Sequence, residues 1–327
     1  MRALQLVKYG EIKDSLVFNE VKKPTVQKQD VLIEVKAAAI NPIDKGIILG
    51  NLQALLPISL PATLAYDVSG IVVDKGDGVS DFEIGDLVYA RVPQEQMGTI
   101  AEYASVGVDA VTKKPGNISF EEAAGLPLAG LTALQSLEYA GIKENDKVLI
   151  HAGSGGVGSF AIQYAKAKGA YVYTTTSTEN VSWVKELGAD RVIDYKTEDY
   201  KNIVKDADIV FDTLGKHYSA EAFEVVKQGG KVVSVVGPLD ESTAKMFGMS
   251  KYKLPEDLAK LSAQKEAEYK FIFMHPNGSH LSEIKAMIED DKIKPIVDEV
   301  YQFSESIDAF NHLASGRAKG KIVIKIS

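Results

Sequence analysis

The 327-residue sequence contains no cysteine. This absence excludes disulfide bonds, a thiol nucleophile, iron–sulfur clusters and zinc sites with cysteine ligands. Long apolar runs are also missing, because no stretch approaches the roughly 18 residues that a transmembrane helix needs. Charged residues recur throughout residues 1–16, so we expect no secretory signal. These absences predict a cytoplasmic protein with no membrane partner.

The sequence also lacks an excess of basic residues. Lys and Arg total 37 against 45 for Asp and Glu, which gives a formal net charge of −8. Nucleic-acid-binding proteins usually carry a basic excess or a basic stripe, so we expect no nucleic-acid partner. With 45% hydrophobic residues, the chain is long enough for about two domains with ordinary apolar cores. The composition is typical of a protein that acts on small molecules.

The hydrophobic pattern changes near residue 121. Before it, strands are short and frequent; Val31, Ile33 and Val35 alternate with polar or outward positions and predict a strand with one buried face. After it, short apolar runs are separated by stretches of helical length, which predicts a parallel sheet covered by helices. These runs are residues 148–150, 171–175, 191–193, 208–211 and 231–236. The last residues read as strand, helix and strand. We predict one domain from residues 1–121 and 291–327 and another from residues 122–290.

One glycine motif lies between a predicted strand and a predicted helix. Gly153, Gly155 and Gly158 form G-x-G-x-x-G after the apolar run 148–150. Glycines in this pattern allow a tight turn, close backbone approach to a pyrophosphate and close helix–strand packing. Two alternatives are a glycine turn without a ligand and the nucleophile elbow of a hydrolase at residues 152–156. An elbow leaves the additional glycines unexplained, so a dinucleotide site is favoured.

The end of the second strand indicates which dinucleotide binds. NAD-binding folds usually place an acid about 20 residues after the glycine motif, but residues 159–178 contain none. The small hydroxyl side chains of residues 174–178 leave room for a 2′-phosphate, which favours NADPH. Glu179 and the lack of a basic residue directly after Thr178 argue against it.

Seven short motifs along the chain are typical of one protein family. They are Ala39-Ile40-Asn41-Pro42-Ile43-Asp44, Ala65-Tyr66-Asp67-Val68-Ser69-Gly70, Gly85-Asp86-Leu87-Val88-Tyr89, Ala101-Glu102-Tyr103, residues 126–133, residues 187–195 and residues 316–321. With the glycine turn, they make the chain resemble the zinc-independent medium-chain dehydrogenase/reductase superfamily, in the quinone oxidoreductase and enone (alkenal) reductase branch. The resemblance implies an α/β protein with a largely β, GroES-like catalytic domain and a Rossmann domain, a doubly wound parallel sheet that binds the nucleotide. It also implies a homodimer.

The resemblance further implies a set of NADPH-binding residues. By position, Gly155, Gly156 and Val157 would contact the pyrophosphate, and Ser177, Thr178 and Tyr195 would surround the adenosine phosphate. Thr132 would lie near the nicotinamide ribose. The backbone of Phe273 and Met274 would flank the nicotinamide, and Arg317 would reach the cofactor from the C-terminal segment. One departure concerns Lys45, because relatives often carry a basic residue one position later, where this chain has Gly46.

The expected chemistry needs no metal. Zinc-dependent members of the superfamily have a histidine in the segment matched by residues 65–67, and this chain has none there. Hydride transfer to a quinone or an α,β-unsaturated carbonyl instead requires a hydrogen-bond donor at the carbonyl oxygen. Asn41 and Tyr66 are the candidate donors, although an Asn before Pro also closes turns and a buried Tyr also bonds backbone. Asp44 is interpreted as a helix cap.

Two functions remain open from the sequence. The first is an NADPH-dependent oxidoreductase that reduces small quinones or enones. The second is a non-enzymatic NADPH-binding protein, such as a redox sensor or a structural protein, because a fold does not determine a function.

Overall fold

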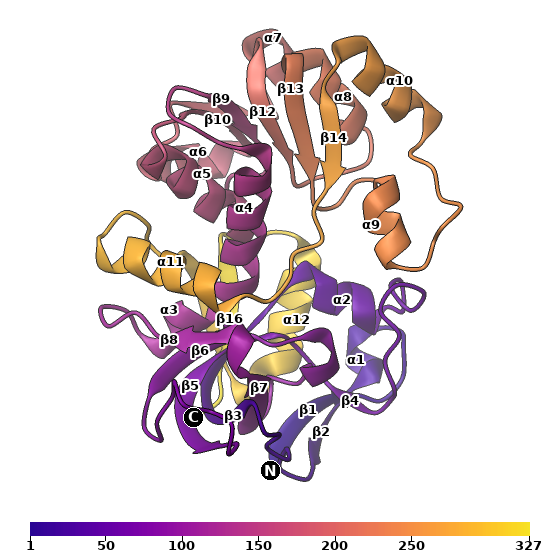
Figure 1. Ribbon diagram of the computed structural model, residues 1–327. Helices are drawn as coiled ribbons and strands as arrows, with labels where there is room; N and C mark the ends of the chain where they lie inside the picture. Colours follow the sequence, from indigo (N-terminus) through magenta and orange to yellow (C-terminus); the bar gives the residue numbers. More distant parts are fainter. The chain divides into compact units, whose positions relative to one another are not determined.

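The computed structural model describes residues 1–327 and contains two compact units. Unit 1 contains residues 1–131, 275–291 and 295–327, and unit 2 contains residues 132–274 and 292–294 (Figure 1). The division differs from the expected domain boundaries because residues 122–131 and 275–290 group with unit 1, and residues 292–294 group with unit 2. For the second segment the physical reason is direct: the Tyr89 hydroxyl donates a 2.5 Å hydrogen bond to the carbonyl of Leu281. No helix of the structure has the length and apolar character needed to cross a membrane.

Unit 1 is largely β. Its strands are β1 (Arg2–Leu6), β2 (Leu16–Glu20), β3 (Asp30–Ile40), β4 (Ala62–Thr63), β5 (Asp67–Lys75), β6 (Leu87–Arg91), β7 (Tyr103–Gly107), β8 (Val111–Lys113), β15 (Val297–Gln302) and β16 (Lys321–Lys325). Its helices are α1 (Ile12–Ser15), α2 (Pro42–Ile48), α3 (Phe120–Ala124), α11 (Gly278–Glu289) and α12 (Ser306–Ser315), with 3₁₀ turns η1 (Gln94–Gln96), η2 (Val108–Ala110) and η4 (Phe303–Glu305). Helix α4 (Pro127–Ala140) begins in unit 1 and continues in unit 2.

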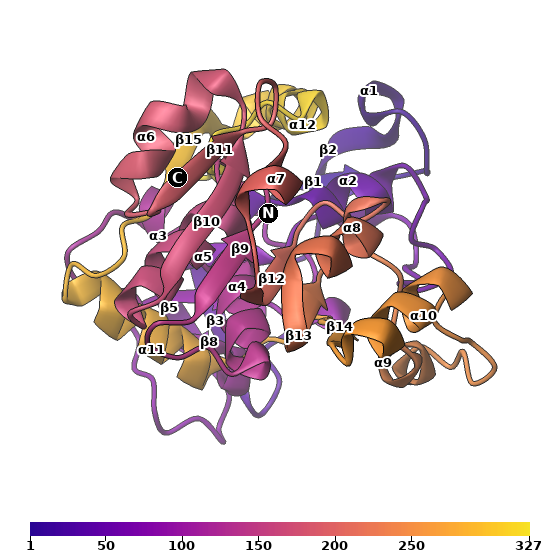
Figure 2. The ribbon, with the colours of Figure 1, turned by 90° about the horizontal axis from the view of Figure 1, so that it is seen from above.

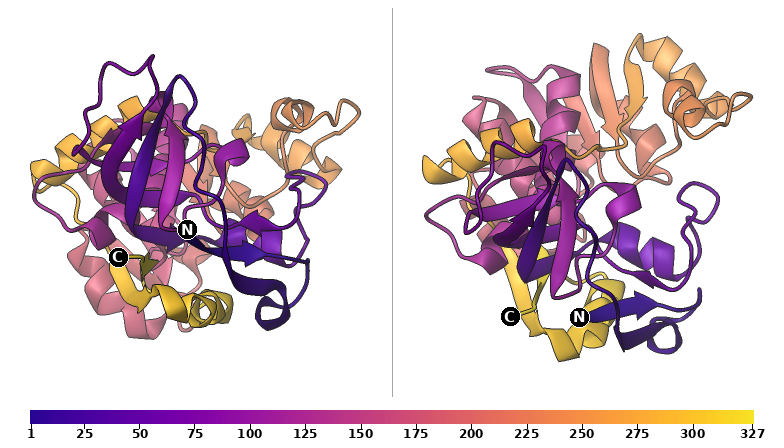
Figure 3. Two further views of the ribbon diagram at one scale, coloured as in Figure 1. Left: turned by 90° about the horizontal axis from the view of Figure 1, so that it is seen from below. Right: turned by 60° about the horizontal axis from the view of Figure 1, so that its bottom comes forward.

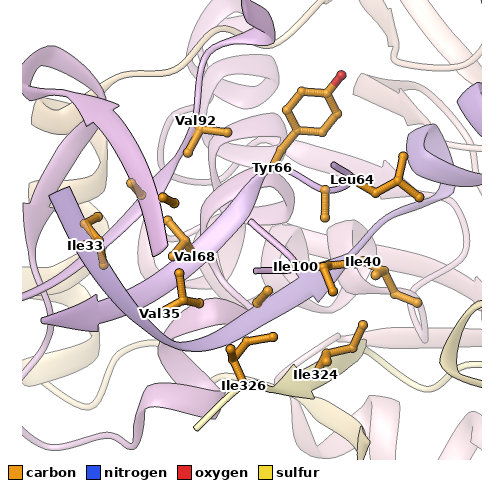
Figure 4. Close-up of a cluster of buried hydrophobic side chains, with 14 of the residues drawn as sticks. Ile33, Val35, Ile40, Leu64, Tyr66, Val68, Val92, Ile100, Ile324 and Ile326 are labelled. Atoms are coloured by element: carbon orange, nitrogen blue, oxygen red, sulfur yellow. The ribbon is translucent and has the colours of Figure 1, made fainter. Parts of the chain in front are cut away.

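The main sheet of unit 1 joins both ends of the chain. Its order is β15-β16-β3-β5-β6-β8, and β7 also pairs with β3. Strand β16 runs antiparallel to β3 with Ile322 opposite Ile40, so the expected return of the C-terminal residues is confirmed (Figure 3). Val31, Ile33 and Val35 are completely buried, as their alternation predicts. Figure 4 shows the aliphatic core that they join, with the Tyr66 hydroxyl pointing away from it.

Unit 2 contains a six-stranded sheet. Its strands are β9 (Lys147–Ile150), β10 (Tyr171–Thr176), β11 (Arg191–Asp194), β12 (Ala207–Asp212), β13 (Val226–Ser234) and β14 (Glu268–Phe271). Its other helices are α5 (Gly156–Ala167), α6 (Val181–Glu186), α7 (Tyr200–Ile203), α8 (Tyr218–Val225), α9 (Glu241–Met246) and α10 (Glu256–Lys265), with the 3₁₀ turn η3 (Thr178–Asn180). The order β11-β10-β9-β12-β13-β14 is all parallel and is the doubly wound 3-2-1-4-5-6 order of a Rossmann fold (Figure 2). The predicted fold class is confirmed for this unit.

Helices cover the sheet of unit 2 because its strands are apolar on both faces. Leu149, Val210 and Val232 pack in one cluster with Phe223 of α8 and Leu258 of α10. Helix α5 packs along β9 and β10. All the carboxyl ends of the strands lie at one edge, where such folds bind ligands.

Candidate active site

The glycine motif forms the turn from β9 to α5. Ala152 has a positive φ of 50°, and the Gly155 N–H donates to its carbonyl at 3.0 Å. Helix α5 then begins at Gly156 with Gly155 as its N-cap. The first N–H groups of a helix have no partner within it and lie at the positive end of its dipole. Gly156 and Val157 therefore present backbone donors suited to a phosphate.

The structure explains the three glycines of the motif in different ways. A Cβ at Gly158 would lie 2.2 Å from the Ala152 carbonyl oxygen, and one at Gly153 would lie 2.2 Å from the Thr174 hydroxyl. Packing therefore requires both. At Gly155 the nearest atom would be the Ala152 carbonyl oxygen at 3.4 Å, an ordinary contact, and φ is −83°. Neither packing nor backbone conformation explains Gly155, so close approach of a ligand is the remaining reason.

Hydroxyl groups and one cation surround the end of β10. Thr178 donates to a carboxylate oxygen of Asp194 at 2.6 Å, and Ser177 accepts from the Asn180 amide at 3.0 Å. Tyr195 follows β11 and is 57% exposed. These three predicted residues lie together because β10 and β11 are parallel neighbours with Thr176 opposite Asp194.

Lys196 is a residue of this group that sequence reasoning missed. Its ammonium lies 2.9 Å from a carboxylate oxygen of Glu179. This hydrogen bond lowers the pKa of Glu179 to about 2, so the anion that argued against NADPH is paired with a cation. The sequence does not reveal this lysine, because it follows β11 rather than Thr178. Only the parallel pairing of β10 with β11 brings it near Glu179.

The segment containing Phe273 and Met274 follows β14. Asp240 accepts from the Phe271 N–H at 3.0 Å, and the Thr243 hydroxyl donates to the Phe271 carbonyl at 3.1 Å. Burial works to raise the pKa of Asp240, but hydrogen bonds from its neighbours outweigh burial and lower it. The Phe273 ring meets Phe247 edge-on at 4.9 Å. Both predicted residues thus leave the sheet at the same edge as the glycine turn.

His151 lies directly before the glycine turn and is fully buried. Its Nδ1 lies 3.2 Å from the Thr175 hydroxyl, and its ring meets Tyr200 edge-on at 4.9 Å. Its Nε2 has no hydrogen-bond partner. Burial lowers the pKa of His151 to about 4, because it disfavours the charged imidazolium more than the nearby charges of Asp212 and Glu221 favour it. The ring therefore stays neutral at pH 7.

We expect His151 to make the folded state sensitive to acid. Between pH 6.5 and pH 4 the unfolded chain binds a proton that the folded ring does not. The free energy of unfolding should therefore fall on acidification, by up to about 1.4 kcal/mol per pH unit in that interval. Urea unfolding at pH 7 and pH 4.5 should show a smaller loss in His151→Gln than in the wild type. Equal losses in the two proteins would contradict the assignment.

Asp44 is a second buried titratable group, and its effect on the pH dependence of stability is opposite to that of His151. Burial raises its pKa to about 7, so its contribution to stability is greatest in acid and declines as the pH rises through 7. Asp44→Asn should remove that contribution and make the net loss in acid steeper than in the wild type.

In unit 1, Asn41 is held from two sides. It lies after β3 and precedes α2, and it is 2% exposed. Its Nδ2 donates to a carboxylate oxygen of Asp67 at 2.9 Å, and its Oδ1 accepts a hydrogen bond from the Lys321 ammonium. An amide has two N–H donors, and Asp67 takes only one of them. The second N–H would be available for the donor role that the sequence predicts for Asn41.

Asp44 is confirmed as a helix cap. Its carboxylate accepts from the Asn41 N–H at 2.7 Å at the start of α2, where Pro42 is the first helical residue. Its other oxygen is buried and has no partner. The cap therefore fixes the backbone of Asn41.

Tyr66 is fully buried, and its hydroxyl donates to the Gln94 side-chain carbonyl at 2.5 Å. The guanidinium of Arg91 lies 4.5 Å from the centre of its ring. Burial raises the pKa of Tyr66, so the phenol stays protonated. Its proton is donated to Gln94, so Tyr66 could donate to a substrate only after this hydrogen bond breaks.

Three further residues named in the sequence analysis have surroundings of their own. Arg317 is exposed in the loop after α12, and Thr132 is buried within α4. Lys45 donates to the Ala314 carbonyl at 3.3 Å, which is a structural role. No group of three or more His, Asp or Glu side chains is arranged to hold a metal ion. The absence of a catalytic metal remains a prediction.

Known families match both units. The alcohol dehydrogenase GroES-like domain matches residues 27–116, and the zinc-binding dehydrogenase family matches residues 187–324. The chain is 35% identical to a 2-methylene-furan-3-one reductase of Solanum lycopersicum and to an NADPH-dependent alkenal/one oxidoreductase of Arabidopsis thaliana; each match covers 99% of this chain and 79% of the relative. The structure of a quinone oxidoreductase from Coxiella burnetii has a TM-score of 0.88 at 34% identity and covers 100% of this chain and 99% of that one. Escherichia coli quinone oxidoreductase complexed with NADPH has a TM-score of 0.84 at 25% identity and covers all of both chains.

These matches establish a protein class: the chain belongs to the medium-chain dehydrogenase/reductase superfamily. Within that superfamily it is a member of the quinone oxidoreductase and alkenal/one reductase branch, an oxidoreductase family. The resemblance noted in the sequence is confirmed, as is the fold class of a GroES-like domain with a Rossmann domain.

Proposed function

We propose that this protein is an NADPH-dependent oxidoreductase that reduces quinones or α,β-unsaturated carbonyl compounds without a metal. One observation carries the proposal: Gly155 is a glycine that neither packing nor conformation requires, at the N-terminus of a helix of twelve residues. That arrangement fits a pyrophosphate, and the hydroxyls and Lys196 at the end of β10 fit a 2′-phosphate.

Different residues of the chain would bind different parts of NADPH. Gly155, Gly156 and Val157 would hold the pyrophosphate, while Ser177, Thr178 and Tyr195 would surround the adenosine phosphate. Thr132, Phe273, Met274 and Arg317 would contact the rest of NADPH, as the family resemblance implies. When bound, NADPH supplies a hydride for the β-carbon of an enone or for a quinone.

Asn41 would stabilise the charge that develops during reduction. Its free N–H is buried, and a donor in a water-poor site acts more strongly on a developing oxyanion than it would in water. Tyr66 remains the second candidate and would first have to release Gln94. Neither side chain is a strong acid, so water would supply the final proton.

The test is NADPH oxidation with a panel of quinones and enones, run with and without a chelator. We expect turnover that chelation leaves unchanged. Tight NADPH binding without turnover on any acceptor would instead support a non-enzymatic redox sensor or structural protein. Loss of turnover on chelation would contradict the metal-free mechanism.

We expect Lys196 to contribute to the choice of NADPH over NADH. Lys196→Ala removes a cation beside the proposed 2′-phosphate site, so NADPH affinity should fall roughly tenfold, equivalent to about 1.4 kcal/mol. NADH lacks that phosphate, and its affinity should stay the same. Fluorescence titration with both cofactors measures the two values, with Lys201→Ala as the control because Lys201 pairs with Glu221 on α8. Equal losses for the two cofactors would contradict this role.

A homodimer and a cytoplasmic location complete the proposal. The family resemblance supports the dimer, and the relatives include chloroplastic and mitochondrial proteins, so the location has to be measured. Light scattering and imaging of a tagged protein would test them.

A further inference from the structure

Lys321 is a buried lysine that the reaction described above does not use. It is 6% exposed and lies on β16, between β15 and β3 in the main sheet of unit 1. Strand β3 pairs with β16 on one side and β5 on the other, with Ala39 opposite Asp67. This order brings together Lys321 at the start of β16, Asn41 directly after β3 and Asp67 at the start of β5.

The three side chains form a connected polar chain. The Lys321 ammonium donates to Oδ1 of Asn41 and, at 3.0 Å, to the carbonyl of Ile40, and lies 3.5 Å from Asp67. Asp67 accepts from Asn41 with one oxygen and, at 2.8 Å, from the Leu128 N–H at the start of α4 with the other. Each partner of the Asn41 amide is therefore itself fixed by backbone.

Stability alone does not explain this cluster. Two acids, Asp44 and Asp67, and two cations, Arg91 and Lys321, are almost completely buried within one unit. Burial raises the pKa of Asp67 and lowers the pKa of Lys321, and the opposite charge of each partner acts against both shifts. Replacing a buried ion pair with apolar residues of similar volume is often neutral or stabilising. The cluster therefore calls for a role beyond holding the fold.

Charge fixes the orientation of the Asn41 amide. Its carbonyl oxygen lies against a cation and its nitrogen against an acid. The reversed amide would place N–H groups against the ammonium and oxygen against the carboxylate, so the two orientations are not equivalent. The cation at Oδ1 also polarises the amide and strengthens its remaining N–H as a donor.

We propose that Lys321 and Asp67 are positioning residues that orient and polarise the Asn41 amide for the carbonyl oxygen of the substrate. This inference rests on the proposed function and adds to it the two groups that prepare the donor. Both residues act through Asn41 and neither needs to touch the substrate.

The decisive variant is the double replacement Lys321→Met with Asp67→Asn. Lys321→Met alone leaves a buried acid without its cation and should lower both Tm and kcat. The double variant removes both charges, so Tm should recover, whereas kcat should stay about tenfold or more below the wild type because the amide is no longer oriented. KM for the acceptor and the affinity for NADPH should change little. Recovery of kcat together with Tm would overturn the proposal.

Two further comparisons keep the test decisive if one variant folds poorly. Lys321→Arg retains a cationic donor and should have a higher kcat than Lys321→Met even where its Tm is lower; a kcat that follows Tm would overturn the proposal. In an Asn41→Ala background, the double replacement should reduce kcat no further, because the positioning residues act through that amide. Multiplying losses would indicate a general structural effect and would also overturn it.

A surface control and the parent activity separate this inference from the proposed function. Lys325→Met, on the same strand, loses a partly exposed pair with Glu121 and should keep wild-type kcat. No turnover by the wild type would refute the proposed function. Wild-type turnover that depends on Asn41 but not on Lys321 or Asp67 would refute only this inference.

Discussion

Replacing Asn41 with alanine is expected to lower kcat for quinone or enone reduction about 100-fold, the usual cost of removing one oxyanion donor. The reason is geometric, because the Asn41 amide is buried, held by Asp67 and Lys321, and retains one N–H. The interaction would form mainly in the transition state, so kcat and kcat/KM should fall together. Steady-state kinetics and an NADPH titration on one preparation measure the effect.

The control for this prediction is Asn19→Ala. Asn19 also forms a side-chain hydrogen bond in unit 1, to Gln5 at 3.0 Å, but it lies on β2, which is outside the main sheet. That variant should keep wild-type kcat. If Asn41→Ala turned over at the wild-type rate while NADPH affinity stayed normal, the role of Asn41 as donor would be refuted, and Tyr66→Phe would be the next variant to measure.

Replacing Gly155 with alanine is expected to weaken NADPH binding by roughly tenfold or more, at least about 1.4 kcal/mol, with little change in Tm. A methyl group here meets only the Ala152 carbonyl oxygen at an ordinary distance, so the fold accepts it. The same methyl group occupies space that a pyrophosphate needs. Cofactor titration and thermal unfolding of the same sample separate the two effects.

Gly158→Ala is the matched control, because a Cβ there would lie 2.2 Å from the Ala152 carbonyl oxygen. This variant should lose Tm, since the turn and helix α5 must move apart. A Gly155→Ala protein with normal NADPH affinity would refute the assignment of the turn as a phosphate site and, with it, the basis of the oxidoreductase proposal.

Local patterns predict most of the fold. Alternation at Val31, Ile33 and Val35 marks β3, and the five apolar runs after residue 121 correspond to β9 through β13. Strand β14 was missed because Glu-Tyr-Lys-Phe is short and half polar at the edge of the sheet. It is a strand because β13 pairs with it, which no local pattern reveals.

Some residues of the proposed site can likewise be predicted from a local pattern, and others cannot. The glycine turn has a local signature, so residues 153–158 are readable from the sequence. Lys321 and Lys196 are not, because a lysine among other lysines or beside an exposed tyrosine is usually solvated. Only the pairing of β16 with β3 and of β10 with β11 gives each one its partners.

The place of β16 in the main sheet of unit 1 has a consequence for the order in which the protein is built. Ribosomes deliver the amino end first, and domains usually fold as they emerge. Here the last strand of the nucleotide-binding sheet ends at Phe271, and β3 can pair with β5 and β7 before that point, but residues 37–40 of β3 meet β16 only when Lys321 to Lys325 have been made. We expect the nucleotide-binding sheet to form during synthesis before the main sheet of unit 1 is complete, and the end of β3 that faces β16 to stay unpaired until Lys321 to Lys325 have been made.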